Sequence, residues 1–339
     1  MEKAIENLKQ KGFLDIKIPK GIDIVAEIKR LKKEKNAIIL AHYYQVPEIQ
    51  AIADYVGDSL GLSQKAAETD AEIIVFAGVH FMAETAKIVN PSKKVLLPDL
   101  LAGCSLAESM PAEEFKPYKE AHPDHVVVTY INCTAEIKAL SDIVCTSSNA
   151  EQIVASIPKD TPIIFAPDRN LGAYIQKKTG RKMLLWDGSC VVHEEFSKEK
   201  IEAIEKKHPD AKFIAHPESE MQILDKADYI GSTSGLIKYV KENNAKKFIV
   251  ATEAGILYKM KQEAPDKILI AAPIYNNVQC ACSECPYMKL NSLEKLYNCI
   301  KYELPEVTVD ENIMDRALLP ITRMLDVSKK ASNISFFKD

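Results

Sequence analysis

The sequence predicts an α/β fold made of three similar parallel-sheet α/β sandwich domains, related by pseudo-threefold symmetry around a central active site. Three observations lead to this prediction. The chain contains a threefold internal repeat, each copy alternates apolar β-type runs with helical segments, and each copy ends near a cysteine. A repeat of domain length indicates duplicated domains, because solenoid units are only about 20 to 50 residues long.

The repeat consists of residues 42–59, 130–147 and 216–233, which align without gaps. Two kinds of position coincide in all three copies, an aspartate (Asp54, Asp142, Asp228) and an isoleucine (Ile49, Ile137, Ile223). We expect domains over residues 1–111, 112–197 and 198–304, with the C-terminal tail 305–339 packing on the first domain.

Each copy begins with an apolar run typical of a strand buried on both faces of a parallel sheet, at residues 37–40, 126–129 and 212–215. A short helix follows, and then a second apolar pulse leads into a Gly/Ser/Thr cluster that opens another helix. A second strand is expected at 72–76, 162–165 and 247–250, and a third at 95–97, 183–186 and 268–270. Strands that alternate with helices in this way predict a parallel sheet.

Composition, net charge and the length of the apolar runs argue against several classes of protein. The 47% hydrophobic and 27% charged residues are typical of a globular protein. The net charge of −4 gives no electrostatic footprint for duplex nucleic acid. No apolar run approaches the length of a membrane span, and the N-terminus shows no apolar signal segment. We therefore expect a cytoplasmic protein with neither nucleic acid nor membrane as a partner.

The eight cysteines are too sparse for a disulfide scaffold, so metal binding or chemistry is the more natural role of those that cluster. One cysteine follows the third strand of each copy: Cys104, Cys190, and one of Cys280, Cys282 or Cys285. One thiolate from each domain suits a soft metal or an iron–sulfur cluster, and a [4Fe–4S] cluster on three cysteines keeps one iron open as a Lewis acid. The alternative is that these cysteines are small buried hydrophobic residues, which is the role expected for Cys133, Cys145 and Cys299.

Polar residues recur directly after the first strand of each copy. Tyr44, Asn132 and Glu218 share one position, and His42, Tyr130 and His216 share another. Titratable groups that face a shared cavity suit proton transfer, whereas the alternative is a set of surface loop residues. His193, three residues after Cys190, is either a site residue or part of a helix start.

The Gly/Ser/Thr clusters at residues 57–59, 146–149 and 232–235 each open a helix. Helix capping alone would explain them. Three inward-facing helix N-termini would also hold a polyanionic substrate, because their backbone N–H groups are available to an anion.

Several long stretches carry a resemblance to a known family. They are AHYYQ (41–45), GDSL (57–60), FMAET (81–85), PDL (98–100), GCSLA (103–107), CTSSNA (145–150), PDRNLG (167–172), HPE (216–218), GSTSG (231–235) and CPYM (285–288). The chain resembles the quinolinate synthase family from about Ala37 to Leu296. The resemblance implies a transferase of NAD (pyridine nucleotide) biosynthesis that condenses iminoaspartate with dihydroxyacetone phosphate to quinolinate, releasing phosphate and water.

The resemblance also implies a [4Fe–4S] cluster on Cys104, Cys190 and Cys285, the last chosen because the family's ligand directly precedes Pro-x-Met. It implies catalytic roles for Tyr44, Tyr130, His193 and Glu218. It further implies a substrate-binding set of His42, Ser59, Tyr130, Asn132, Ser147, His216, Glu218 and Thr233. A transient contact with an L-aspartate oxidase, which would supply iminoaspartate, is a further expectation.

Three alternatives stay open at this point. One is another hydro-lyase that uses an open iron, and one is a redox-sensing iron–sulfur protein with four protein ligands. The third is a zinc-stabilised module that binds sugar phosphates, which metal analysis would separate from an iron–sulfur protein.

Overall fold

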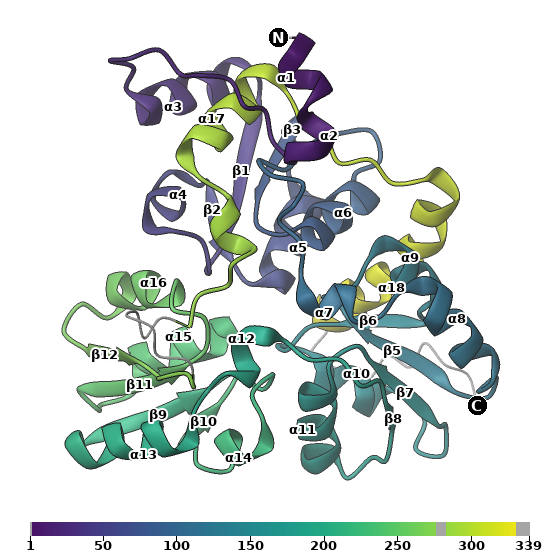
Figure 1. Ribbon diagram of the computed structural model, residues 1–339. Coiled ribbons are helices and arrows are strands. Elements are labelled where there is room, and N and C mark those ends of the chain that lie inside the picture. Colours follow the sequence, from purple (N-terminus) through teal and green to yellow (C-terminus); the bar gives the residue numbers. More distant parts are fainter. Residues whose placement is uncertain (1, 276–282, 330–339) are drawn as a thin grey trace. The chain divides into compact units, whose positions relative to one another are not determined.

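The computed structural model describes residues 2–275 and 283–329 (Figure 1). The chain forms two compact units, residues 1–104 with 285–318 and residues 105–284 with 319–339. The first unit holds one four-stranded sheet and the second unit holds two. Every strand pair in these sheets is parallel. The predicted α/β fold with three similar parallel sheets is confirmed.

The three sheets share one strand order, β2-β1-β3-β4, β6-β5-β7-β8 and β10-β9-β11-β12. The first contains β1 (Ala37–His42), β2 (Tyr55–Gly57), β3 (Ile73–Ala77) and β4 (Lys94–Leu96). The second contains β5 (Val126–Tyr130), β6 (Ile143–Cys145), β7 (Ile163–Ala166) and β8 (Leu184–Leu185). The third contains β9 (Ala211–Ala215), β10 (Tyr229–Ile230), β11 (Lys247–Ala251) and β12 (Ile268–Ala271).

The sequence predicted three strands in each sheet, and the structure adds a fourth. The second apolar pulse of each copy forms a short edge strand, because its backbone pairs with the carboxyl end of the central strand, as Tyr130 with Cys145. The repeated aspartate fixes this pairing, since its side chain accepts a hydrogen bond from a central-strand N–H at the same register in each copy. The N···O distances are 2.7 Å for Asp54 with Ile39, 2.8 Å for Asp142 with Val127 and 2.8 Å for Asp228 with Phe213.

Helices cover both faces of the sheet in the first unit. Its elements are α1 (Glu2–Glu6), α2 (Leu8–Lys11), α3 (Ile24–Glu34), α4 (Pro47–Ile52), α5 (Ser59–Glu68), α6 (His80–Val89), η1 (Met288–Leu290), α17 (Leu293–Tyr302) and the start of α18 (Glu311–Lys329). In Figure 1, α3 and α17 run side by side along this sheet, and their apolar faces share a buried core with β1 and β3. Ile28 and Leu31 of α3 pack there with Leu296 and Ile300 of α17.

In the second unit, helices likewise pack against the sheets, of which there are two. Its helices are α7 (Ser105–Glu108), α8 (Ala112–Glu120), α9 (Ala135–Leu140), α10 (Ala150–Ser156), α11 (Arg169–Thr179), α12 (Val191–Glu194), α13 (Lys198–Lys207), α14 (Met221–Leu224), α15 (Thr233–Glu242) and α16 (Ile256–Glu263). One core forms between α8, α9 and the second sheet around Phe115 and Val127, and another forms between α13, α14 and the third sheet around Phe213 and Ile249.

The C-terminal part of the chain contributes to both units. α17 lies in the first unit, where its apolar face is buried against α3 and β1. Of the tail, Glu306 pairs with Leu96 beside the first sheet, whereas the Arg323 guanidinium donates to the carbonyl of Asp142 in the second unit at 2.7 Å. The predicted boundaries at 111, 197 and 304 stay predictions.

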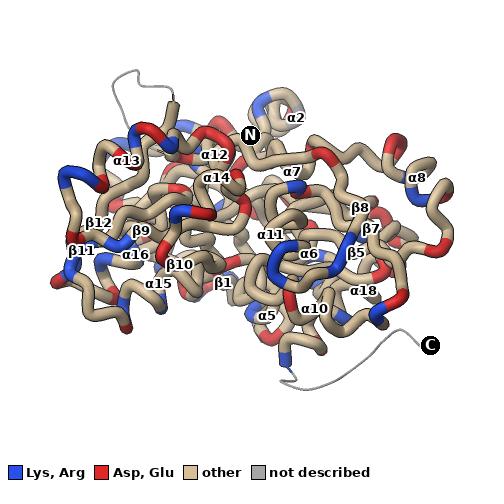
Figure 2. The backbone as a smooth tube through the Cα atoms, turned by 90° about the horizontal axis from the view of Figure 1, so that it is seen from below, with Lys and Arg blue, Asp and Glu red and all other residues tan. Residues whose placement is uncertain are grey.

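Charged residues of both signs are interspersed along the described chain (Figure 2). No helix among the described residues is long and apolar enough to cross a bilayer.

Candidate active site

Glu218 is the centre of a buried polar cluster in the second unit. It lies in the loop that follows β9, and the residue is 3% exposed. Its Oε1 accepts a hydrogen bond from the hydroxyl of Tyr130, the last residue of β5, and its Oε2 lies 3.0 Å from Nδ1 of His193. The carboxyl ends of two different parallel sheets therefore contribute to one cluster, which is where open α/β folds place functional groups.

The charge state of Glu218 follows from its neighbours. Burial alone would raise the pKa of this carboxyl, but the neighbouring imidazoles of His193 and His216 and the hydrogen bonds with His193 and Tyr130 act in the opposite direction and outweigh burial. Together they hold the pKa of Glu218 well below its ordinary value. Glu218 is thus an ionised carboxylate, an acceptor for the Tyr130 hydroxyl and for ring N–H groups.

His193 connects Glu218 to Cys190. It lies in α12, the short helix that starts directly after Cys190, and its side chain is buried. Nδ1 of His193 is 3.2 Å from Sγ of Cys190, and Nε2 is 3.0 Å from Oγ1 of Thr252. One ligand atom from each of Cys190, His193 and Glu218 lies within 4.8 Å of the other two, a donor set that fits metal binding.

His216 forms the second imidazole of the cluster. Its ring lies 4.9 Å from that of His193, and its Nε2 is 3.2 Å from Oγ of Ser147. Ser147 lies in the cluster that precedes α10, and Thr233 is the first residue of α15. Helix α15 is capped by Ser232, whose side chain accepts a hydrogen bond from the Gly235 N–H. Capping is therefore an observed role of this cluster, and anion binding stays a prediction.

Three buried oxygens near these residues have no hydrogen-bond partner in the described part of the chain. They are Oδ1 of Asn132, two residues after the end of β5, Oδ2 of Asp168, the N-cap of α11, and Oγ of Ser219, which directly follows Glu218. Buried polar atoms are normally paired, so an unpaired amide oxygen at a strand tip is suited to a ligand. Burial, with the charge of Glu218 in addition, raises the pKa of Asp168 well above its ordinary value.

The first unit places the remaining predicted residues at the carboxyl end of its own sheet. His42 ends β1, and its Nδ1 accepts a hydrogen bond from the Tyr44 N–H at 3.1 Å. In the third copy, Nδ1 of His216 accepts from the Glu218 N–H at 3.4 Å, so both histidines shape their loops in the same way. Ser59 is the first residue of α5, whose N-cap is Asp58.

Cys285 is held beside this strand tip. The Gln45 amide donates to the carbonyl of Met288 at 3.1 Å, and the Lys289 ammonium donates to the carbonyl of Tyr44 at 2.7 Å. Cys104 ends the first segment of the same unit. Cys280 and Cys282 lie outside the described residues.

Exposure separates the cysteines into two groups. Cys104, Cys190 and Cys285 are partly exposed, whereas Cys133, Cys145 and Cys299 are buried, as expected for structural residues. Burial raises the pKa of the Cys145 and Cys299 thiols, which keeps them protonated and poor metal ligands. The donor chemistry of the three partly exposed cysteines therefore fits thiolate ligation.

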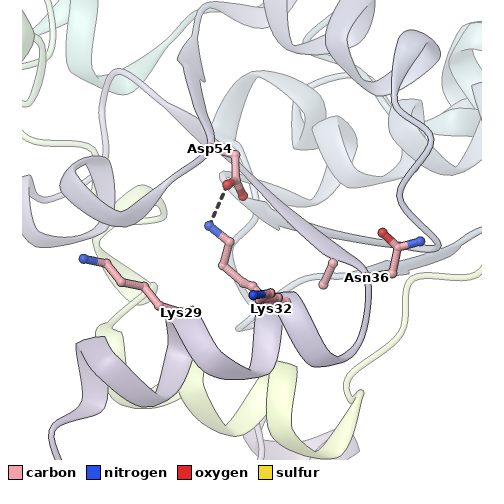
Figure 3. Close-up of a pocket in the computed structure, with 6 residues that line it drawn as sticks. Lys29, Lys32, Asn36 and Asp54 are labelled. Carbon is pink, nitrogen blue, oxygen red and sulfur yellow. Dashed lines mark hydrogen bonds and ion pairs between the residues drawn. The ribbon is translucent and has the colours of Figure 1, made fainter.

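A lysine-lined pocket of about 430 Å³ lies in the first unit (Figure 3). It lies at the amino end of β1 between Lys29, Lys32, Asn36 and Asp54, where Lys32 forms an ion pair with Asp54 at 2.7 Å. None of the predicted site residues lines it.

Two comparisons bear on the family. The family model described as "Quinolinate synthetase A protein" matches residues 26–326. The chain belongs to the quinolinate synthase family. Curated relatives named quinolinate synthase are 61% identical in Microcystis aeruginosa over 306 residues, covering 90% of this chain and 95% of the relative. A relative in Nostoc punctiforme is 61% identical over 307 residues, covering 91% of this chain and 94% of the relative. The resemblance seen in the sequence is confirmed, and the chain is an enzyme of this family.

Sequence reasoning missed two residues of this quinolinate synthase family cluster. Thr252 touches His193, and the Asn170 amide donates to the backbone carbonyl of Glu218 at 3.1 Å. Thr252 follows directly on Ala251, the last residue of β11, so the strand-tip rule applied to the second long strand of each copy would have found it. Asn170 lies in the stretch PDRNLG (167–172), which carried the resemblance to the family. Its position in the sequence gave no reason to expect a contact with Glu218.

Proposed function

We propose that this enzyme condenses iminoaspartate with dihydroxyacetone phosphate to quinolinate, with release of phosphate and water, as a step of NAD biosynthesis. The observation that carries the proposal is the buried carboxyl group of Glu218, joined to Tyr130 and His193 beside the thiol of Cys190, in a chain of this family. Ring closure with loss of water needs groups that give and take protons at neighbouring atoms, and these side chains supply them.

The proposed cofactor is a [4Fe–4S] cluster held by Cys104, Cys190 and Cys285. Their partial exposure supports this choice over the buried Cys133 and Cys299. When bound, such a cluster with one iron not held by protein supplies a Lewis acid for dehydration.

The polar side chains of the cluster take different roles according to where they lie. Glu218 accepts a hydrogen bond from the Tyr130 hydroxyl, so the two side chains are placed together for proton transfer with the substrate. His193 lies against both Cys190 and Glu218 and would orient hydroxyl groups of the substrate. Asn132 offers its unpaired amide oxygen as a hydrogen-bond acceptor.

The substrates carry carboxylates and a phosphate, and the chain offers groups suited to them. His216 with Ser147 form one hydrogen-bonded pair in the second unit. Thr233 opens α15, and in the first unit Ser59 opens α5 near the tip residues His42 and Tyr44. Helix starts favour anions because unpaired N–H groups and the helix dipole point toward them.

The test is anaerobic reconstitution of the full chain with iron and sulfide, followed by measurement of bound metal and of quinolinate formation. We expect about four irons and four sulfides per chain. Cys104→Ala, Cys190→Ala and Cys285→Ala should each lose both the cluster and activity. Cys133→Ala and Cys299→Ala, which remove buried thiols, should retain both. A reconstituted chain that binds one zinc and no iron, or binds the cluster without forming quinolinate, would contradict the proposal.

A further inference from the structure

The imidazole of His193 has a polar neighbour at both ring nitrogens. Nδ1 faces Glu218 Oε2 at 3.0 Å and Cys190 Sγ at 3.2 Å, while Nε2 faces Thr252 Oγ1 at 3.0 Å. Rotation of the ring by half a turn about its Cβ–Cγ bond would place carbon atoms at both contacts. The hydroxyl of Thr252 therefore opposes this rotation from the side of the ring away from Glu218.

Thr252 is itself firmly held. It follows β11 directly and is 1% exposed. Its backbone carbonyl accepts a hydrogen bond from the Ser283 hydroxyl at 2.9 Å, and the Ala254 N–H donates to the carbonyl of Ser283 at 2.9 Å. Threonine is also branched at Cβ, which limits rotation of its side chain. The hydroxyl that meets His193 is thus presented in a fixed direction.

The fold does not require a hydroxyl at this position. Ala77, Ala166 and Ala251 occupy the same register at the ends of β3, β7 and β11, because each pairs with the corresponding residue of its central strand. The next residue is Gly78 in the first copy and Pro167 in the second, and neither carries a hydroxyl. Thr252 is therefore a specialised feature of the third copy, the copy that also supplies Glu218.

We propose that Thr252 is a positioning residue that locks the ring of His193 so that Nδ1 faces Glu218 and Cys190. A hydroxyl suits this task because it can donate to a bare ring nitrogen or accept from an N–H. The consequence for turnover rests on the proposed function, whereas the orientation of the ring does not.

Three variants test the proposal in the reconstituted enzyme. Thr252→Val keeps the shape and removes the hydroxyl, and Thr252→Ser keeps the hydroxyl. Thr85→Val is the control, since Thr85 is also buried but its hydroxyl donates to the carbonyl of Phe81 within α6. At equal iron and sulfide content, we expect Thr252→Val to lower kcat about tenfold, the equivalent of one hydrogen bond of about 1.4 kcal/mol. Thr252→Ser should recover most of this loss, and Thr85→Val should match the wild type.

A crystal structure of the loaded Thr252→Val enzyme gives a readout that does not depend on activity. We expect the His193 ring to be turned or to adopt more than one orientation, with the Nδ1–Glu218 contact weakened. The proposal is overturned if the ring keeps its place in this variant, or if Thr252→Ser is as impaired as Thr252→Val. If the wild-type enzyme forms no quinolinate, the proposed function fails, and the ring orientation still decides the role of Thr252.

Discussion

Glu218→Gln tests the central carboxylate of the cluster. The substitution keeps the shape of the side chain and removes its charge. In the wild type, one carboxylate oxygen accepts from the Tyr130 hydroxyl and the other lies 3.0 Å from Nδ1 of His193. Glutamine has a single acceptor oxygen and an NH2 group on the other side. At least one of the two acceptor positions is therefore replaced by a donor.

The size of the effect follows from the bond that is lost. A hydrogen bond to a charged group contributes about 1.5–3 kcal/mol. Since about 1.4 kcal/mol corresponds to a factor of ten, loss of orientation alone lowers kcat about 10- to 150-fold. General acid–base catalysis contributes about 10²- to 10⁴-fold, so a drop beyond the first range indicates that Glu218 also transfers a proton.

The assay is anaerobic quinolinate formation at matched iron and sulfide content. Glu220→Gln is the control, because Glu220 lies two residues further along the same loop and its carboxylate contacts the exposed Gln222 amide. We expect the control to keep wild-type kcat and KM. Wild-type kinetics for Glu218→Gln at full cluster content would refute the reasoning, since a buried carboxylate at the centre of the site cannot be neutralised without cost.

Two further substitutions probe the surroundings of the site. Asp168→Asn keeps an N-cap acceptor for the Leu171 N–H and removes a carboxyl whose pKa is raised by burial. The folded wild type holds this proton more tightly than the unfolded chain, so its stability relative to the Asn variant falls as pH rises above about 4, the ordinary pKa of aspartate. The unfolding midpoint of the wild type, measured relative to that of Asp168→Asn, should fall between pH 5 and pH 8 in thermal scans, and a difference that stays constant would contradict this. Lys138 is fully buried and donates to the carbonyl of Cys133. Lys138→Met should lower the free energy of unfolding by about 1–3 kcal/mol, measured by urea titration, because it removes this donor. Lys138→Gln should lower it less, because Gln50 occupies the same position in the first copy and its amide donates to the carbonyl of Gln45. Equal losses for both would show that the donor does not matter.

The repeat made much of the fold predictable. Asp54 and its two counterparts mark the same place in every sheet, and the structure shows the same side-chain bond to the central strand in each. The apolar runs located the long strands because a strand buried on both faces needs a continuous apolar sequence. The edge strands were missed because two or three residues carry too little pattern to tell a strand from a loop.

Part of the site could also be predicted from the repeat and its strand pattern. Residues directly after a parallel strand gather at one edge of the sheet, and the structure joins Tyr130 and Glu218 there. Thr252 and Asn170 could not be found by counting from the first strand of each copy, since they reach the cluster from β11 and α11.

The sequence by itself determined the element types, the threefold repetition and the kinds of polar group at the strand tips, because these depend on local periodicity and composition. Only the tertiary structure decided which of these groups meet, and that His193 lies between Glu218 and Thr252. Such choices depend on contacts between residues distant in the chain, where many pairings satisfy the same local pattern and only packing selects among them.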